Sequence, residues 1–249
     1  MHKFMKKLLT LVLFFTLLVS CKKDVPAAQN TQPEATPKDS VSPAFAVKVE
    51  ESSVEEFGGG TPVALLEGFK KDNPGGDTLQ KPFVVINTQK QKLTFKNINP
   101  AMQKGYYDED ELIYTDLGYS KKINRHLLHA QYYEGDDYFL IDNTTTKTDT
   151  INGLPDFSPD ARKMICYYIN PYNERKYLLS ADIEIYDLTE NGLITLHRET
   201  YDYIPCEIRW KDNNTILLKV LPGDEFDKMQ SDTVNKTNYN YLYKKIHLK

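Results

Sequence analysis

The chain has 249 residues, of which 27% are charged and 40% hydrophobic, with a formal net charge of −4. These proportions suit a globular body with a flexible extension, and one domain is expected. An acidic chain without clustered Lys and Arg has no electrostatic basis for binding nucleic acid, because neutralising phosphates requires such clusters.

Residues 1–20 have the three regions of an export signal. Three lysines precede the apolar-plus-threonine run Leu8–Val19, and Ser20 completes a processing site of small residues. The run is too short to span a bilayer, which needs roughly 20 helical residues. We therefore predict a cleaved signal peptide over residues 1–20.

The residues around the predicted cleavage site resemble a lipobox. Leu18-Val19-Ser20-Cys21 is similar to the motif of bacterial lipoproteins. That resemblance implies that Cys21 becomes the first mature residue, with a diacylglyceryl group on its sulfur and an acylated amine. Each buried methylene contributes about 0.8 kcal/mol, so several chains anchor a protein at a membrane. The alternative is an ordinary cleaved signal with a chance cysteine.

The residue after Cys21 bears on the destination. The residue after Cys21 is Lys22 and not aspartate, which resembles lipoproteins that are sent to the outer membrane. We therefore expect a lipid-anchored protein of a bacterial cell envelope, at the outer membrane. Whether it faces the periplasm or the cell surface stays open.

Residues 21–82 have the composition of a lipidated cysteine followed by a flexible tether. Four prolines are spaced among polar residues, and Gly58-Gly59-Gly60 and Asn73-Pro74-Gly75-Gly76 follow. Such a segment buries too little apolar surface to offset its ordering entropy. Within it, Phe45–Val49 alternates like a strand, and Val63–Lys71 is long enough for two helical turns.

Residues 83–249 have the texture of an all-β domain. Short alternating runs rich in Val, Ile, Thr, Tyr and Phe are separated by turn residues. The predicted strands are Phe83–Thr88, Lys92–Asn97, Leu112–Leu117, Leu127–Tyr133, Tyr138–Asn143, Thr146–Ile151, Lys163–Ile169, Asp182–Asp187, Leu193–His197, Cys206–Trp210, Thr215–Leu221 and Tyr239–Ile246. No long amphipathic helix is predicted among them.

The domain contains a repeat. Residues 138–165 parallel residues 183–218: a strand that ends in Asp, a hairpin, a second strand, and an aromatic residue before another hairpin. A fainter third copy begins at Val85. Periods of about 50 residues indicate a stacked β repeat.

One segment of the repeat resembles a known family. Pro155-Asp156-Phe157-Ser158-Pro159-Asp160 is similar to the repeat of Tol-type (WD40-like) periplasmic β-propellers, in which a hairpin glycine usually follows. Ala161 stands at that position, and a left-handed backbone there costs about 1 to 2 kcal/mol, so we expect a different turn. The whole layout also resembles that of lipoproteins of the Bacteroidetes group.

The number of repeats bears on the fold class. Closed propellers need about four to eight blades. Residues 83–249 supply three recognisable units and a terminal strand. We expect an all-β fold, a propeller-like stack of three to four small antiparallel sheets that is small or incomplete, with a β-sandwich as the alternative.

Histidines and acidic clusters offer weak candidates for metal sites. His126 and His129 would share a face on a helix, but on the predicted strand their spacing points them to opposite faces. His197 and His247 are isolated in the sequence. The cluster Asp108–Glu111 lacks the glycine-containing spacing of a calcium loop, and Glu134–Asp137 is similar, which favours solvated turns. No metal site and no cofactor is expected.

Cysteine chemistry leaves two alternatives. With Cys21 lipidated, Cys166 and Cys206 remain, and they are either a disulfide or two separate thiols. Neither has an identifiable histidine partner. No serine lies in a glycine-flanked nucleophile elbow, and no glycine-rich phosphate loop precedes a helix. The sequence therefore predicts no catalytic residue.

The 17 tyrosines fall in clusters. Tyrosine combines a rigid apolar ring with a polar tip, which suits both half-buried β packing and ligand contact. Packing is the default interpretation, but clusters exposed at one rim would favour a protein or glycan contact surface. The clusters are Tyr106–Tyr107, Tyr132–Tyr133, Tyr167–Tyr168 with Tyr172, Tyr201 with Tyr203, and Tyr239, Tyr241 and Tyr243.

Two functions follow from these observations. The first is a non-catalytic binding or scaffolding lipoprotein, held at the membrane by acylated Cys21, that meets a protein or glycan partner. The alternative is a hydrolase or accessory enzyme acting on envelope or extracellular polymer. The alternative predicts carboxylates that converge in one pocket, with at least one strongly perturbed pKa.

Overall fold

The computed structural model describes residues 46–62, 69–70, 81–170, 179–231 and 239–249. The predicted signal peptide, Cys21 and the predicted tether as far as residue 45 lie outside these residues. So does most of Val63–Lys71, where helical turns were expected. Within the described ranges, no helix has both the length and the apolar character needed to cross a membrane.

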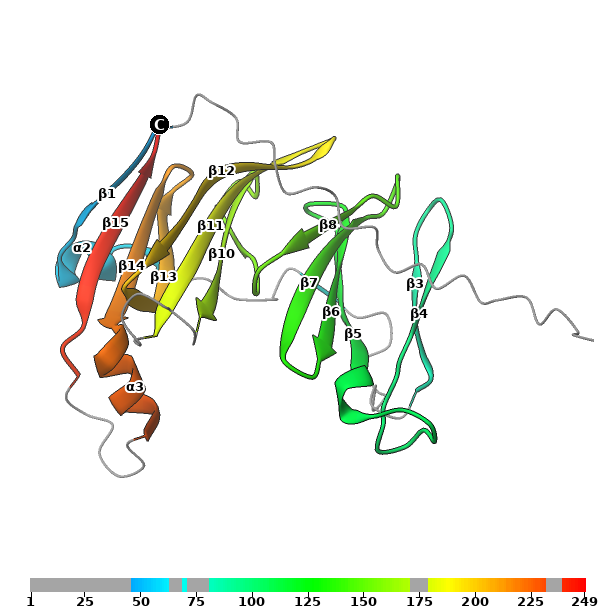
Figure 1. Ribbon diagram of the computed structural model, residues 1–249. Helices are drawn as coiled ribbons and strands as arrows, with labels where there is room; N and C mark the ends of the chain where they lie inside the picture. The colour runs from blue at the N-terminus through cyan, green and yellow to red at the C-terminus, as the bar shows by residue number, and fades with distance from the viewer. Residues whose placement is uncertain (1–45, 63–68, 71–80, 171–178, 232–238) are drawn as a thin grey trace, which may run out of the picture. The chain divides into compact units, whose positions relative to one another are not determined.

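The described residues form four antiparallel sheets, which follow one another in chain order except that β1 and β2 at the start of the described chain join the last sheet (Figure 1). The first consists of β3 (Phe83–Asn87) and β4 (Lys92–Lys96); the second of β5 (Leu112–Ser120), β6 (Arg125–Tyr132), β7 (Gly135–Asp142) and β8 (Thr148–Ile151). The third has the order β12 (Gly192–Tyr201), β11 (Ser180–Thr189), β10 (Lys163–Asn170), β9 (Asp156–Phe157). The fourth has the order β1 (Val47–Glu51), β15 (Leu242–Leu248), β14 (Thr215–Pro222), β13 (Tyr203–Asp212), β2 (Thr61–Pro62).

The predicted fold class is confirmed: the protein is all-β, with four small antiparallel sheets, none of them closed. Each strand range predicted after residue 82 overlaps an observed strand. Three short helices accompany the sheets in the described residues: α2 (Val54–Gly58), η2 (Asp108–Asp110) and α3 (Gly223–Ser231). Helix α3 was not predicted from the sequence; its Phe226 packs against the fourth sheet.

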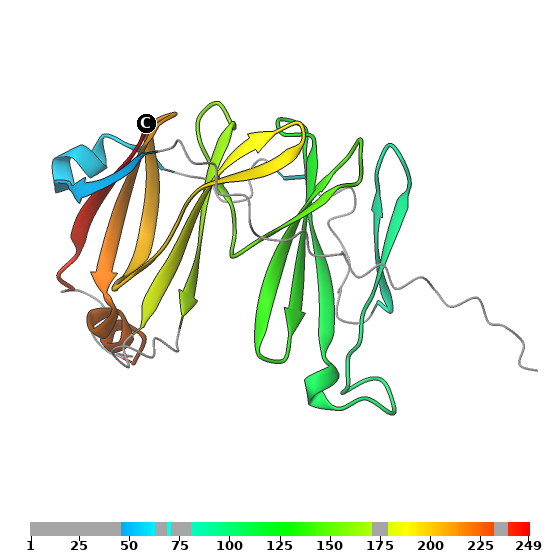
Figure 2. The ribbon, with the colours of Figure 1, turned by 45° about the horizontal axis from the view of Figure 1, so that its top comes forward.

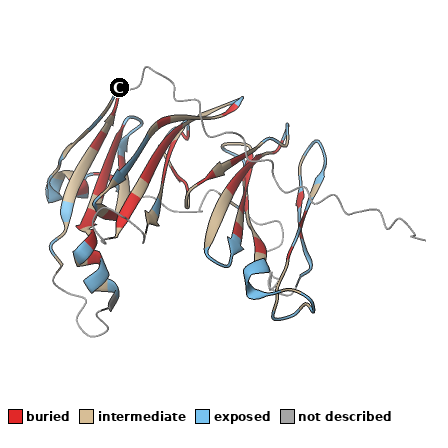
Figure 3. Ribbon diagram, viewed as in Figure 1, coloured by how far each residue is buried: buried red, intermediate tan, exposed pale blue. Residues whose placement is uncertain are grey.

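Three hydrophobic clusters lie between successive sheets. Figure 3 shows that buried residues occur on strands throughout the sheets. Val84 and Phe95 of the first sheet pack with Leu128 of the second. Leu127 of the second packs with Met164 of the third, and Ile165 of the third packs with residues of the fourth. Figure 2 shows the resulting series of sheets from a second direction.

The strand period of two explains how one strand serves two clusters. On β6, Leu127 faces the third sheet and the adjacent Leu128 faces the first. On β10, Met164 and Cys166 face the second sheet while Ile165 faces the fourth. These inner strands read as continuous apolar runs because both of their faces are buried.

The sequence repeat is offset from the sheets. The copy at residues 138–165 supplies β7 and β8, which end the second sheet, and β9 and β10, which begin the third. The copy at residues 183–218 does the same for the third and fourth sheets. Each copy therefore links two neighbours, which keeps successive sheets in contact.

Because alanine replaces the usual glycine, we expected the turn after β9 to avoid a left-handed backbone at Ala161. That expectation was wrong. Ala161 adopts a left-handed backbone with φ 58°. Its amide donates to the Ser158 carbonyl at 2.8 Å, and Asp160 Oδ1 accepts from the Ser158 hydroxyl at 2.7 Å and from the Arg162 amide at 3.0 Å. These hydrogen bonds offset the cost of about 1 to 2 kcal/mol for a Cβ in that conformation.

The ordered body begins before residue 83. Strand β1 pairs with β15 along its whole length, and Val49 packs on the cluster between the third and fourth sheets. Glu56 of α2 accepts from Lys211 at 2.9 Å and from Lys245 at 3.1 Å. Strands β1 and β2, in the range expected as tether, thus belong to the fourth sheet, and α2 between them contacts β14.

Candidate functional site

A pocket of about 450 Å³ lies where the second, third and fourth sheets meet. Its volume falls in the range of about 300 to 1,000 Å³ that small-molecule sites occupy. It is lined by Asp136, Tyr138, Gly153, Leu154, Asp156, Tyr167, Tyr168, Ile169, Cys206, Glu207 and Ile208. The pocket therefore draws on four separate parts of the chain: β7, the loop from β8 into β9, β10 and β13.

A bulge in β13 contributes to one wall. The pairing with β14 shifts register between Pro205 and Glu207, and Cys206 is passed over in the ladder. Proline lacks the amide that a continuous ladder requires, and bulges redirect side chains. The Cys206 residue is exposed at this point, but its thiol is partly desolvated, which raises the pKa of the thiol. The charge of Lys219 lowers that pKa by a smaller amount.

Gly153 permits the close approach of two walls. Its φ is 100°, a region that disfavours side chains, and a Cβ there would lie 2.2 Å from the carbonyl oxygen of Tyr167. Glycine at this position therefore brings the loop between β8 and β9 against β10.

Asp156 is the most perturbed acid of the pocket. The residue is 2% exposed, and Trp210 Nε1 donates to its Oδ1 at 3.1 Å. Burial raises the pKa of Asp156 from 3.8 to about 7, although the hydrogen bond from Trp210 works in the opposite direction. The carboxyl is therefore close to half ionised at neutral pH.

A second wall carries an acid, a histidine and an aromatic ring in contact. His129 Nε2 lies 3.0 Å from Asp136 Oδ2, and the His129 ring stacks on Tyr138 with centroids 4.6 Å apart. Burial, followed by the charge of Asp136, raises the pKa of Tyr138 to about 12. Tyr138 is thus a neutral aromatic surface held in place by its neighbours.

The third acid, Glu207, is paired within its own strand. Its Oε1 accepts from Arg209 Nε at 2.8 Å and Nη2 at 2.6 Å. Within the described part of the chain, no Lys, Arg or His lines the pocket. The pocket is accordingly aromatic, apolar and acidic, which disfavours anionic ligands.

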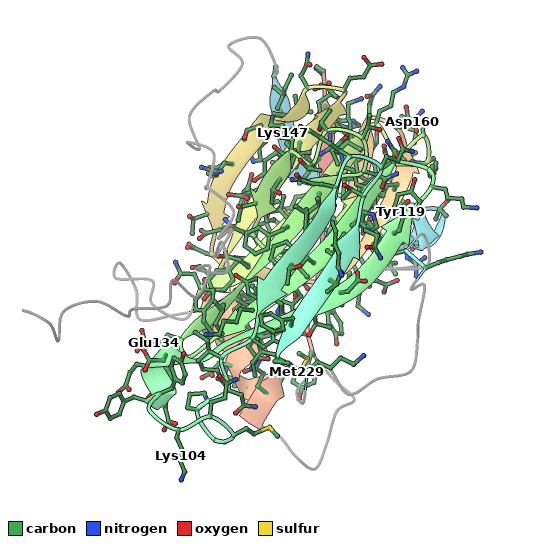
Figure 4. All side chains as sticks on the ribbon, turned by 90° about the vertical axis from the view of Figure 1, so that its right-hand side faces the viewer. Lys104, Tyr119, Glu134, Lys147, Asp160 and Met229 are labelled. Carbon is green, nitrogen blue, oxygen red and sulfur yellow. The ribbon has the colours of Figure 1, made fainter. Side chains whose placement is uncertain are left out.

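Tyr168 of the lining is exposed, as are Tyr132 at the end of β6 and the adjacent Tyr133. Tyr132 is 38% exposed, Tyr133 56% and Tyr168 37%. Burial and Asp137 raise the pKa of Tyr132, and Tyr168 adds a smaller effect, which places these two phenols near each other. In Figure 4, Glu134 marks the β6–β7 turn that carries Tyr133, at the end of the sheets opposite Lys147 and Asp160.

The histidines considered for metal binding lie apart from one another. His126 is buried and packs on Tyr119 with ring centroids 4.8 Å apart, whereas His129 contacts Tyr138 and Asp136. The prediction that His126 and His129 point to opposite faces of a strand is confirmed. His197 and His247, isolated in the sequence, do have neighbours: Tyr201 at 2.9 Å and Glu50 at 3.1 Å.

The remaining candidates are distributed over the domain. Asp108–Asp110 forms the exposed helix η2, outside the pocket, whereas Asp136 of the second acidic cluster lines the pocket. No disulfide joins Cys166, which is buried between the second and third sheets, to Cys206. Among the described residues, no group of three or more His, Cys, Asp and Glu is arranged to hold a metal ion.

The sequence reading did not single out Asp156. The pattern that could have indicated it is an acid placed between Pro155 and Phe157, in a segment whose other residues are mostly buried. Trp210, the one tryptophan of the chain, was noted as part of a repeat but not as a donor to that acid. A carboxyl and an indole 54 positions apart meet only through packing of the third sheet on the fourth.

Comparison with models of protein families, with curated proteins and with solved structures finds no match to this chain.

Proposed function

We propose that this protein is a binding module that is anchored in a bacterial cell envelope through acylated Cys21 and takes a small ligand, or a projecting group of a protein or glycan partner, into the three-sheet pocket. The observation that carries the proposal is the pocket itself. It combines tyrosine rings with acids held by neighbouring side chains, as recognition sites do. Exposed tyrosines beside it extend the surface a partner would meet.

The anchor is part of the same proposal. The lipobox-like residues that end at Cys21 support membrane attachment at the outer membrane, with the face still to be assigned. Mass spectrometry of the processed N-terminus should find an acylated cysteine, and Cys21→Ser should release the protein into the soluble fraction. A bare thiol on a membrane-free wild-type product would contradict the anchor.

Site-specific photo-crosslinking in intact cells tests the binding role. A photoreactive residue at Tyr168, which lines the pocket, should give a defined adduct. The same residue at Glu190, in the exposed β11–β12 turn, serves as the matched control. Identical adducts at both positions, or none at Tyr168 under several growth conditions, would refute a specific partner at the pocket.

A second function, hydrolysis of an envelope or extracellular polymer, is favoured by one observation. Asp156, with a pKa of about 7, holds a proton in about half of the molecules at neutral pH and shares its pocket with Asp136 and Glu207. General-acid hydrolysis uses two carboxyl groups in one site, one of which has a raised pKa and donates a proton. Chromatography of envelope glycans incubated with wild type and Asp156→Asn tests it: cleavage by wild type alone supports hydrolysis, and no cleavage by either rejects it.

A further inference from the structure

The three acids of the pocket differ in their neighbours. Glu207 forms an ion pair with Arg209, and Asp136 Oδ2 lies 3.0 Å from His129 Nε2. No Lys, Arg or His of the described ranges forms an ion pair with Asp156, whose contact is the neutral indole of Trp210. A buried carboxylate without a cationic partner is costly for the folded protein.

The walls around this acid suit a cation. Tyr138, Tyr167 and Tyr168 present aromatic rings, and a cation within about 6 Å of a ring centroid is attracted to its π face. Leu154, Ile169 and Ile208 add apolar surface to the lining. An ammonium group bound here would supply the missing partner of Asp156 and use the rings as well.

We propose that the pocket recognises a ligand that carries a primary or quaternary ammonium group, with the Asp156 carboxylate as its counter-ion. This inference rests on the proposed binding function and names the ligand class for the same pocket. Anionic ligands are disfavoured because the acids repel them and the lining residues that the structure describes include no Lys, Arg or His to offset that repulsion. Neutral analogues bind more weakly because they leave Asp156 unpaired.

The titratable groups that share the pocket with Asp156 come from three strands. They are Asp136 and Tyr138 of β7, Tyr167 and Tyr168 of β10, and Cys206 and Glu207 of β13. Burial holds the pKa values of Tyr138, Tyr167 and Cys206 above their ordinary values, so these three groups are neutral at neutral pH. Binding of an ammonium ligand displaces the proton of Asp156, so affinity rises as the pH passes through about 7.

Three small probes of similar size test the charge preference: benzylammonium, benzyl alcohol and benzoate. Their binding to the full chain in detergent is followed by protection of Cys206 from iodoacetamide, read on its own peptide by mass spectrometry. At about pH 8 we expect benzylammonium to bind at least about tenfold more tightly than benzyl alcohol, with benzoate weaker still. The preference should shrink several-fold at about pH 6.

Two variants locate the effect. Asp156→Asn, an isostere that keeps the oxygen facing Trp210, should reduce the preference for benzylammonium to about threefold or less. Glu109→Gln, at an exposed acid of η2 that is not part of the pocket lining, should leave it unchanged. If Asp156→Asn fails to fold, the wild-type pH series alone still decides, because it needs no substitution.

Three results would overturn the ammonium assignment: no protection of Cys206 by benzylammonium, equal affinity for benzyl alcohol, or a preference that persists in Asp156→Asn. A neutral disaccharide that protects Cys206 better than benzylammonium would also overturn it, while leaving the pocket as a binding site. The binding function itself fails only if crosslinking from Tyr168 also fails, so the two outcomes are distinguishable.

Discussion

Replacement of Asp156 by Asn should make the protein more stable at alkaline pH. The free energy involved follows from the difference between the pKa of this acid in the unfolded chain, 3.8, and in the folded protein, about 7. A tenfold change in acidity corresponds to about 1.4 kcal/mol, so the ionised carboxylate costs the folded state about 4 kcal/mol. That is a large part of the stability of an ordinary domain, about 5 to 15 kcal/mol.

The sign follows from which state holds the proton more tightly. Below about pH 4 the carboxyl is protonated in both states and costs nothing. Between about pH 4 and pH 7 the unfolded chain releases the proton and the folded protein keeps it, so wild type loses stability as the pH rises. Asp156→Asn does not titrate. Its free energy of unfolding, relative to wild type, should therefore grow by about 4 kcal/mol between about pH 4 and pH 8.

Urea unfolding at a series of pH values measures this difference. Trp210 is the only tryptophan and donates to Asp156, so its fluorescence reports on the site. Glu109→Gln, an exposed acid, should show a flat difference from wild type. A flat difference for Asp156→Asn as well, or one that falls with rising pH, would refute the buried, unpaired carboxyl.

Three further substitutions or reactions test the packing around the pocket. In a urea titration, Gly153→Ala should lower the free energy of unfolding by more than about 1 to 2 kcal/mol, because Gly153 has a positive φ and an added Cβ would clash with backbone. The control Gly58→Ala has open space around its Cβ and should change the free energy of unfolding by less than about 1 kcal/mol. In thermal unfolding, Val49→Asp should lower the free energy of unfolding by about 1 to 3 kcal/mol, and the control Lys48→Gln should lower it by less than about 0.5 kcal/mol. Equal effects of the two substitutions would contradict the packing of β1 on the domain. Iodoacetamide should label Cys206 in the native protein, while the cysteine buried between the second and third sheets reacts only after denaturation; peptide mapping that finds both labelled would contradict this burial.

Local sequence was sufficient to predict the strands. The run Lys163–Ile169 and its relatives alternate or remain apolar over strand lengths, and residues such as Asn152-Gly153 punctuate them, so each strand is specified within a few neighbours. The repeat likewise predicted several small sheets. In contrast, β1 was recognisable only as the alternation Phe45–Val49, because its membership in the domain depends on pairing with β15, nearly 200 positions later.

The candidate site depended on tertiary structure throughout. Nothing near Asp156 in the sequence marks it as unusual, since its raised pKa comes from burial among residues of other sheets. Cys206 reaches the pocket through a bulge whose register the ladder with β14 decides. The sequence by itself determined the strand pattern, the repeat and the lipobox-like start, because those reside in short-range periodicity and composition. Only the packing of three sheets decided which acids, rings and thiol share one cavity, because desolvation and contact are properties of distance in space.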